Sequence, residues 1–120
     1  MPMIRTSKRG DVVRVRLDPS EGAEQGGDRP ALILSPDVIN EHSPVVLIAS
    51  ITSKKTERVY PFEVLISPPE GGLKHRSKVL LMQIRSIDKR RVSGFYGSLS
   101  IESMSRVEEA VRVATGLTRF

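Results

Sequence analysis

The chain has 120 residues, a length that most often folds as one unit, so we expect a single domain over residues 1–120. It contains no cysteine, which excludes a disulfide framework, a thiolate nucleophile and a cysteine-bound metal. Lys and Arg number 19 against 14 Asp and Glu, and the resulting net charge of +5 favours a polyanionic partner such as nucleic acid. No stretch has the apolar length of a signal peptide or a membrane span, so we expect a cytoplasmic protein.

The first half of the chain predicts three strands. Residues 12–17 alternate apolar with charged side chains, the period of a half-buried strand. The polar, glycine-rich segment 21–28 predicts a long hairpin loop before a second strand at 31–35. Residues 37–41 fit one helical turn, and the apolar run 45–51 predicts a buried third strand.

The next segment predicts two further strands, at 62–66 and 79–85. Strict alternation in 79–85 would place Gln83 and Arg85 on the same face as its buried apolar residues. Such polar side chains either need structural partners or line a cleft, and the pattern leaves both alternatives open. Residues 73–78 are rich in Lys, Arg and His and predict a basic rim at the surface.

The chain closes with a short sixth strand at 92–97 and a helix. Ser100 is a suitable N-cap for that helix, and Gly116 is a suitable stop. An apolar face packed on the core is predicted by residues that recur at helical spacing, Ile101, Met104, Val107, Val111 and Ala114. The pattern predicts a mainly β fold with helices (α+β), a small antiparallel barrel with a C-terminal helix.

The segment EQGGDRPALILS, residues 24–35, places an arginine between two glycines and a strand. If the second and third strands pair in antiparallel fashion, Arg29 lies near Thr52 at the far end of the third strand. A guanidinium and a hydroxyl suit phosphodiester chemistry, because one stabilises negative charge and the other donates to a phosphate oxygen. The alternative is a hairpin turn with a solvated arginine and a hydroxyl that caps the end of a strand.

The remaining residue types argue against other chemistries. His42 and His75 are far apart and lack partners at metal-ligand spacing, so we expect neither a metal site nor a cofactor. The glycine pair of residues 26–27 lacks the spacing of a phosphate-binding loop, and nothing resembles the nucleophile elbow of a serine hydrolase.

Five motifs in this order resemble the MazF/PemK family of toxin endoribonucleases over essentially the whole chain. They are RGDVVRVRLDP at 9–19, EQGGDRPALILSPD at 24–37, VVLIASITSK at 45–54, GGLKHRSKVLLMQIRSIDKRR at 71–91, and the helix that follows Ser100. The resemblance implies an SH3-like barrel, a homodimer, and sequence-specific cleavage of single-stranded RNA, mostly messenger RNA. It also implies a metal-independent reaction that leaves a 2′,3′-cyclic phosphate and a 5′-hydroxyl.

The same resemblance assigns roles to individual residues. Arg29 matches the essential arginine of the family and Thr52 its essential threonine. RNA-binding positions are matched by Glu24, Gln25, Ser53 and Gln83. Ala23 and Met82 stand where relatives often carry a serine and an acidic residue, and both differences concern the recognised RNA sequence.

The resemblance further implies a cognate antitoxin whose acidic, disordered tail blocks the RNA groove and whose complex with the toxin binds DNA. Two alternative functions remain open at this point. One is a non-catalytic toxin of the same barrel fold that binds DNA gyrase, as in the related CcdB group, and the other is an RNA-binding module without activity. The end of the chain, residues 116–120, lacks the tryptophan typical of gyrase poisons.

Overall fold

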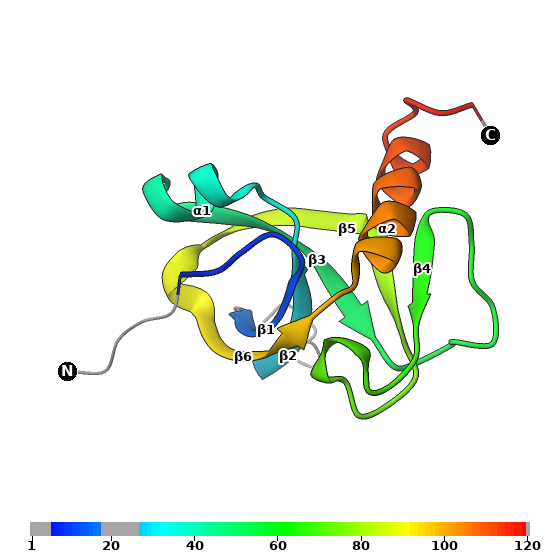
Figure 1. Ribbon diagram of the computed structural model, residues 1–120, viewed down its shortest axis with the longest axis horizontal. Coiled ribbons are helices and arrows are strands. Elements are labelled where there is room, and N and C mark those ends of the chain that lie inside the picture. The colour runs from blue at the N-terminus through cyan, green and yellow to red at the C-terminus, as the bar shows by residue number, and fades with distance from the viewer. Residues whose placement is uncertain (1–5, 18–26, 120) are drawn as a thin grey trace.

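The computed structural model describes residues 6–17 and 27–119, so Ala23, Glu24 and Gln25 lie outside the described residues. The described chain forms one six-stranded antiparallel sheet in the order β4-β5-β3-β2-β1-β6 (Figure 1). Its strands are β1 Asp11–Leu17, β2 Gly27–Ile33, β3 Val45–Thr52, β4 Glu63–Ile66, β5 Ser77–Asp88 and β6 Val92–Ser98. The α-helices are α1 Asp37–His42 and α2 Ile101–Ala114.

This arrangement confirms the predicted mainly β fold with a C-terminal helix. The sheet curls strongly, as the barrel prediction requires, but in the described part of the chain it remains open, with β4 and β6 as its edge strands (Figure 1).

Apolar side chains pack on both faces of the sheet. On one face α2 lies beside β4 and β5, and its Val107 and Ala110 are buried against Leu81 and other strand residues. The opposite face holds a second cluster, formed by Val13, Val15, Ala31, Ile33, Val46, Ile48 and Ile87. Because successive strand residues point to opposite faces, the central strands contribute to both clusters.

Helix α2 begins and ends as predicted, but one residue of its predicted apolar face is exposed. The Ser100 hydroxyl accepts a hydrogen bond from the Ser103 backbone N–H at 3.1 Å, the expected N-cap contact. Ile101 is 87% exposed, so its predicted burial is wrong. At 3.6 residues per turn Ile101 lies about 120° around the helix from the buried Val107, outside the packed stripe.

Two strands differ from the predicted boundaries by more than one residue. Strand β2 begins at Gly27 rather than residue 31, because its first residues pair with the end of β1. Arg29, predicted to lie between the loop and the strand, is therefore a strand residue opposite Val15. Strand β5 extends beyond the predicted 79–85 at both ends, since it pairs with β3 and β4 along its length.

Strict alternation along β5 is also wrong. One step along β3, from Ala49 to Ser50, corresponds to four residues along β5, from Ile84 to Leu80. The extra residues form a bulge, which bends a strand and redirects its side chains. Leu81 in the bulge points into the core, whereas Gln83 is exposed.

Candidate active site: a cationic groove

A groove of about 720 Å³ runs over the ends of several strands. The side chains that line it come from all strands of the described sheet except β6, together with the loop after β3. They are Leu17, Arg29, Ser50, Ile51, Thr52, Lys54, Lys55, Tyr60, Glu63, Lys78, Leu80, Gln83, Ile84 and Arg85. Five of these are Lys or Arg and one is Glu, so the groove suits an anionic ligand.

The sheet register brings Arg29 and Thr52 to this groove together. Strands β2 and β3 pair in antiparallel fashion, with Ala31 opposite Ser50. Two residues further on, the same register sets Arg29 level with Thr52. The pairing itself ends at Ala31 and Ser50, and both Arg29 and Thr52 line the groove, in line with their predicted proximity.

Arg29 is held by the sheet rather than carried on a loop. It is half-buried, its Cα lies opposite that of Val15 in β1, and its Nε atom is buried. A guanidinium stays protonated under all ordinary conditions and presents donors in a planar fork that matches two phosphate oxygens. A positive charge fixed in this way can stabilise negative charge that develops on a bound phosphate.

Thr52 is the last residue of β3, and its hydroxyl has a structural contact. The Thr52 Oγ1 atom accepts a hydrogen bond of 3.1 Å from the backbone N–H of Lys54. A hydroxyl can accept and donate at once, so this contact orients the oxygen and leaves its hydrogen for a ligand. The strand-end role considered as an alternative is real, and it is compatible with phosphate binding.

The other polar residues singled out in the sequence differ in where the structure places them. Gln83 and Arg85 both line the groove, which favours the cleft-lining alternative for these polar residues of β5. Ser53 is exposed and lies in the chain between the groove-lining residues Thr52 and Lys54. Glu24 and Gln25 lie outside the described residues, and their role stays a prediction.

Sequence reasoning missed an ion pair in the groove. Lys78, predicted to lie on a basic surface rim, is only 5% exposed, and its Nζ atom donates to Glu63 Oε1 at 2.9 Å. The same Nζ donates to the Arg58 carbonyl oxygen at 2.9 Å and lies 5.9 Å from the centre of the Tyr60 ring. The available signal was the position of Lys78 at the start of an apolar run, where a strand residue is more often buried than exposed.

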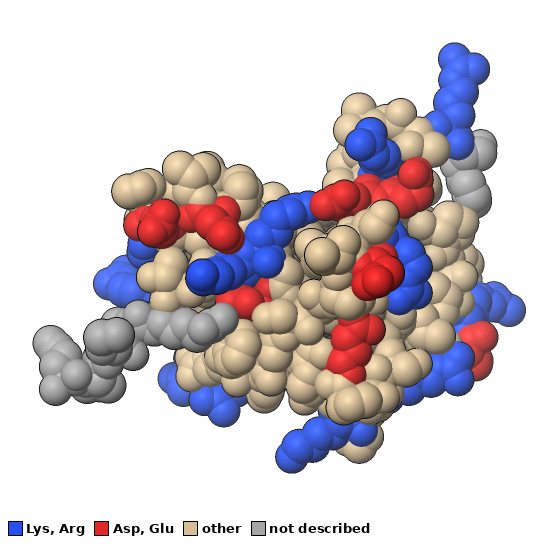
Figure 2. Space-filling view, in the orientation of Figure 1, with Lys and Arg blue, Asp and Glu red and all other residues tan. Residues whose placement is uncertain are grey.

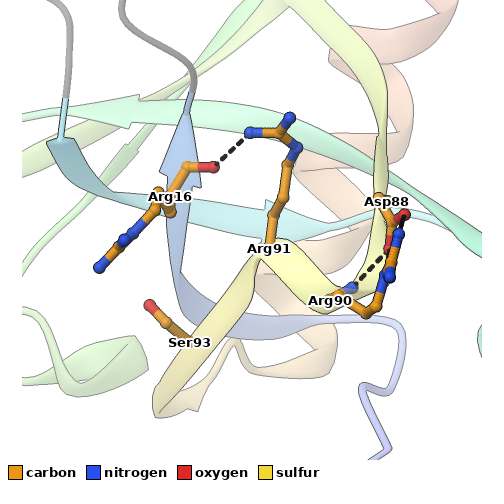
Figure 3. A pocket seen from close by; sticks show the side chains of 5 residues that line it. All are labelled: Arg16, Asp88, Arg90, Arg91 and Ser93. Atoms are coloured by element: carbon orange, nitrogen blue, oxygen red, sulfur yellow. Dashed lines mark hydrogen bonds and ion pairs between the residues drawn. The ribbon is translucent and has the colours of Figure 1, made fainter.

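A separate hollow of about 420 Å³ lies at the turn between β5 and β6. Its lining consists of Arg16, Asp88, Arg90, Arg91 and Ser93 (Figure 3). Arg90 folds back onto Asp88, with a distance of 2.8 Å from its Nη2 to Asp88 Oδ2, and Arg91 donates to the Arg16 carbonyl oxygen. These contacts occupy donors that a ligand would need, and the hollow contains none of the predicted site residues.

The hydrogen bonds from Arg90 hold the pKa of Asp88 at about 2, below its ordinary value. Within residues 6–17 and 27–119, no three His, Asp or Glu side chains gather as a metal site. None of the helices in the described chain is long and apolar enough to cross a bilayer.

The curled sheet, its terminal helix and the groove define a small mainly β protein with a cationic groove that suits an anionic ligand. Residues 8–115 match the family described as the PemK-like, MazF-like toxin of type II toxin–antitoxin systems. The chain belongs to this family.

Individual relatives agree with this assignment. The chain is 39% identical over 113 residues to the endoribonuclease EndoA of Bacillus subtilis (strain 168), covering 94% of this chain and 97% of EndoA. Its fold is similar to that of MazF in a MazE–MazF crystal structure from Deinococcus radiodurans, with a TM-score of 0.77, 28% identity and coverage of 96% and 100%. A mycobacterial endoribonuclease in complex with its cognate antitoxin has the same fold, with a TM-score of 0.79, 24% identity and coverage of 95% and 99%.

Proposed function

We propose that this protein is a toxin of a type II toxin–antitoxin system and an endoribonuclease that cleaves single-stranded RNA, chiefly messenger RNA, at specific sequences. The observation that carries the proposal is the position of Arg29 and Thr52 along one cationic groove. Further support comes from membership of the toxin family and from the likeness to EndoA over nearly the full length of both chains.

In the proposed reaction, the 2′-hydroxyl of the substrate attacks the adjacent phosphorus. A 2′-O–P bond forms as the P–O5′ bond breaks, the 2′-oxygen loses its proton and the 5′-oxygen gains one. The products are a 2′,3′-cyclic phosphate and a 5′-hydroxyl. The nucleophile belongs to the substrate, so the reaction requires neither an enzyme nucleophile nor a metal.

Arg29 would stabilise the negative charge that builds up on the phosphate oxygens in the transition state. Because a guanidinium stays protonated at ordinary pH, it is a poor proton acceptor, so we assign Arg29 an electrostatic role rather than general base catalysis. Thr52 would donate its hydroxyl hydrogen to a phosphate oxygen, since Lys54 already fixes the orientation of Oγ1. Ser53, Gln83, Glu24 and Gln25 would bind the nucleotides on either side.

The proposal includes two protein partners. One is a cognate antitoxin whose acidic tail occupies the same groove, which the excess of cations along the groove favours. The other is a second copy of this chain in a homodimer, as implied by the resemblance to the family. The messenger RNA substrate would place the reaction in the cytoplasm.

The test is to incubate the purified protein with a long single-stranded RNA in EDTA and to map the new 5′ ends. The wild-type protein should cleave at a recurrent sequence and leave 5′-hydroxyl ends. Arg29→Ala and Thr52→Ala should still fold but cleave far more slowly, whereas Arg112→Ala, a change on the exposed side of α2, should cleave normally. Intact RNA with the wild-type protein, or undiminished cleavage by both groove variants, would refute the proposal.

A further inference from the structure

Lys78 stands directly beside Thr52 in the groove. Strands β3 and β5 place the two residues opposite each other, and β4 pairs with the other edge of β5 there. Directly opposed residues in an antiparallel pair have Cβ atoms about 4.5–5.5 Å apart and point to the same face of the sheet. Both side chains line the groove, so the register places Lys78 next to Thr52 there.

The burial of Lys78 requires an explanation. Its side chain is 7% exposed and that of its partner Glu63 is 10% exposed. Taking two charges out of water costs free energy that their attraction often does not recover, so a buried ion pair is weak evidence for a stabilising role. A pair of apolar residues would fill the same space without that cost, and this makes a functional role the better explanation.

The contacts of Lys78 leave it able to bind a ligand. An ammonium group has three N–H donors, and acceptors among the described residues take two of them, Glu63 Oε1 and the Arg58 carbonyl oxygen. These two contacts fix the position of Nζ, so little side-chain entropy is lost when a third acceptor arrives. Lys54 and Lys55 are exposed, and solvent screens their charges more than it screens a buried one.

We propose that Lys78 is a further substrate-binding residue of this groove, which binds the same RNA phosphate as Thr52 while Glu63 holds its ammonium group in place. The proposal rests on the RNA-cleaving function proposed above. It assigns to Glu63 a positioning role, because its carboxylate touches Lys78 and not the substrate.

The decisive variant replaces the ion pair by apolar residues of similar size, Lys78→Met together with Glu63→Leu. This change leaves the net charge of the groove unaltered. It removes the ammonium group together with two backbone contacts, the one from Lys78 to the Arg58 carbonyl oxygen and the one from the Tyr60 N–H to Glu63. If the ion pair has only a structural role, the double variant should bind RNA as the wild type does, because apolar replacement of a buried ion pair is often neutral or stabilising for the fold. If Lys78 contacts an RNA phosphate, the double variant should fold normally but bind RNA more weakly and cleave it more slowly.

Binding is measured by fluorescence anisotropy with a 2′-O-methyl RNA of the mapped substrate sequence, which lacks the nucleophile and cannot be cleaved. We expect the double variant to lose about tenfold or more in affinity and in single-turnover rate, the scale of one charge-assisted hydrogen bond. The slope of log affinity against log salt concentration should also become shallower by about 0.7, the value for one phosphate of a single strand. Lys78→Arg keeps the charge and should restore most of the affinity and the slope.

Lys74→Met, at an exposed lysine that does not line the groove, is the matched control and should bind and cleave like the wild type. A folded double variant with wild-type affinity, rate and salt slope would overturn the inference.

If the double variant fails to fold, Glu63→Gln decides. It removes the competing negative charge while its amide oxygen still accepts from Lys78, so it should bind RNA more tightly, and unchanged affinity would overturn the inference. A wild-type protein that neither binds nor cleaves RNA would instead refute the proposed function.

Discussion

A guanidinium at position 29 can bind two phosphate oxygens at once, and this geometry predicts a graded response to substitution. Arg29→Ala removes both the charge and the donors, and we expect the single-turnover cleavage rate to fall by about 10²–10³, as for the loss of one oxyanion donor. Arg29→Lys keeps a point charge but not the planar fork, so its rate should lie between those of Arg29→Ala and the wild type. Equal rates for Arg29→Lys and Arg29→Ala would show that the planar fork, and not the charge, is essential.

Asp88 supplies a prediction about pH. Its pKa is about 2 because the side chain and the backbone N–H of Arg90 donate to its carboxylate. The folded value lies below the unfolded one, so this contact stabilises the fold above a pH of about 4, and its contribution is lost as the pH falls towards the folded value.

Arg90→Gln should raise the pKa of Asp88 towards its ordinary value, which an NMR titration of the carboxyl carbon would measure. Arg91→Gln is the control and should leave that pKa almost unchanged, because the Coulomb interaction of Arg91 with Asp88 contributes least to lowering it. A pKa near 2 in Arg90→Gln would mean that the backbone N–H alone is sufficient.

Some site residues could be predicted from the sequence, and others could not. Arg29 and Thr52 stand near opposite ends of two consecutive strands, so the assumption of antiparallel pairing was enough to bring them together. The contact of Lys78 with Glu63 depends on the register between β4 and β5, and a change of one residue would turn either side chain to the other face. Hydrophobic alternation does not determine such a register when several offsets bury the same apolar residues.

Helix α2 illustrates how far local signals reach at the level of an element. Its N-cap follows from Ser100 alone, because a serine that precedes a helix satisfies an otherwise unpaired backbone N–H. The buried face does not follow from spacing alone, since Ile101 shares the apolar periodicity but lies outside the stripe that the sheet covers. The start of β2 was missed because glycine, aspartate and proline disfavour strands, and pairing with β1 overrides this preference.

The N-cap of α2 can be tested by substitution. Ser100→Ala removes the acceptor of the Ser103 N–H, and we expect the free energy of unfolding to fall by about 1 kcal/mol. Ser105→Ala, at an exposed position within the same helix, is the control and should be neutral or slightly stabilising, because alanine is the better helix former. Urea unfolding curves measure both, and an equal effect of the two changes would contradict the capping role.

For the whole molecule, net charge predicts a polyanionic ligand but does not locate its site. In Figure 2, acidic and basic side chains are interspersed over the visible face, so charge composition alone marks no single patch there. The concentration of cations arises when strands from distant parts of the sequence meet at the groove. The bulge in β5 lies among its groove-lining residues, between Leu80 and Ile84, and no local sequence signal predicted that bulge.

The groove therefore predicts how RNA binding depends on salt. It is lined by five cations, Arg29, Lys54, Lys55, Lys78 and Arg85, and by a single described acid, Glu63. Each phosphate of a single strand that is neutralised contributes about −0.7 to the slope of log affinity against log salt, so we expect a total slope between about −2 and −4. Anisotropy titrations with uncleavable RNA at several salt concentrations measure this slope, and Arg112→Ala should give a parallel line because its charge lies outside the groove. A slope near zero would contradict phosphate binding and indicate that the groove recognises the bases instead. Among the described residues that line the groove, Tyr60 has the one aromatic ring on which a base could stack, and this ring is exposed.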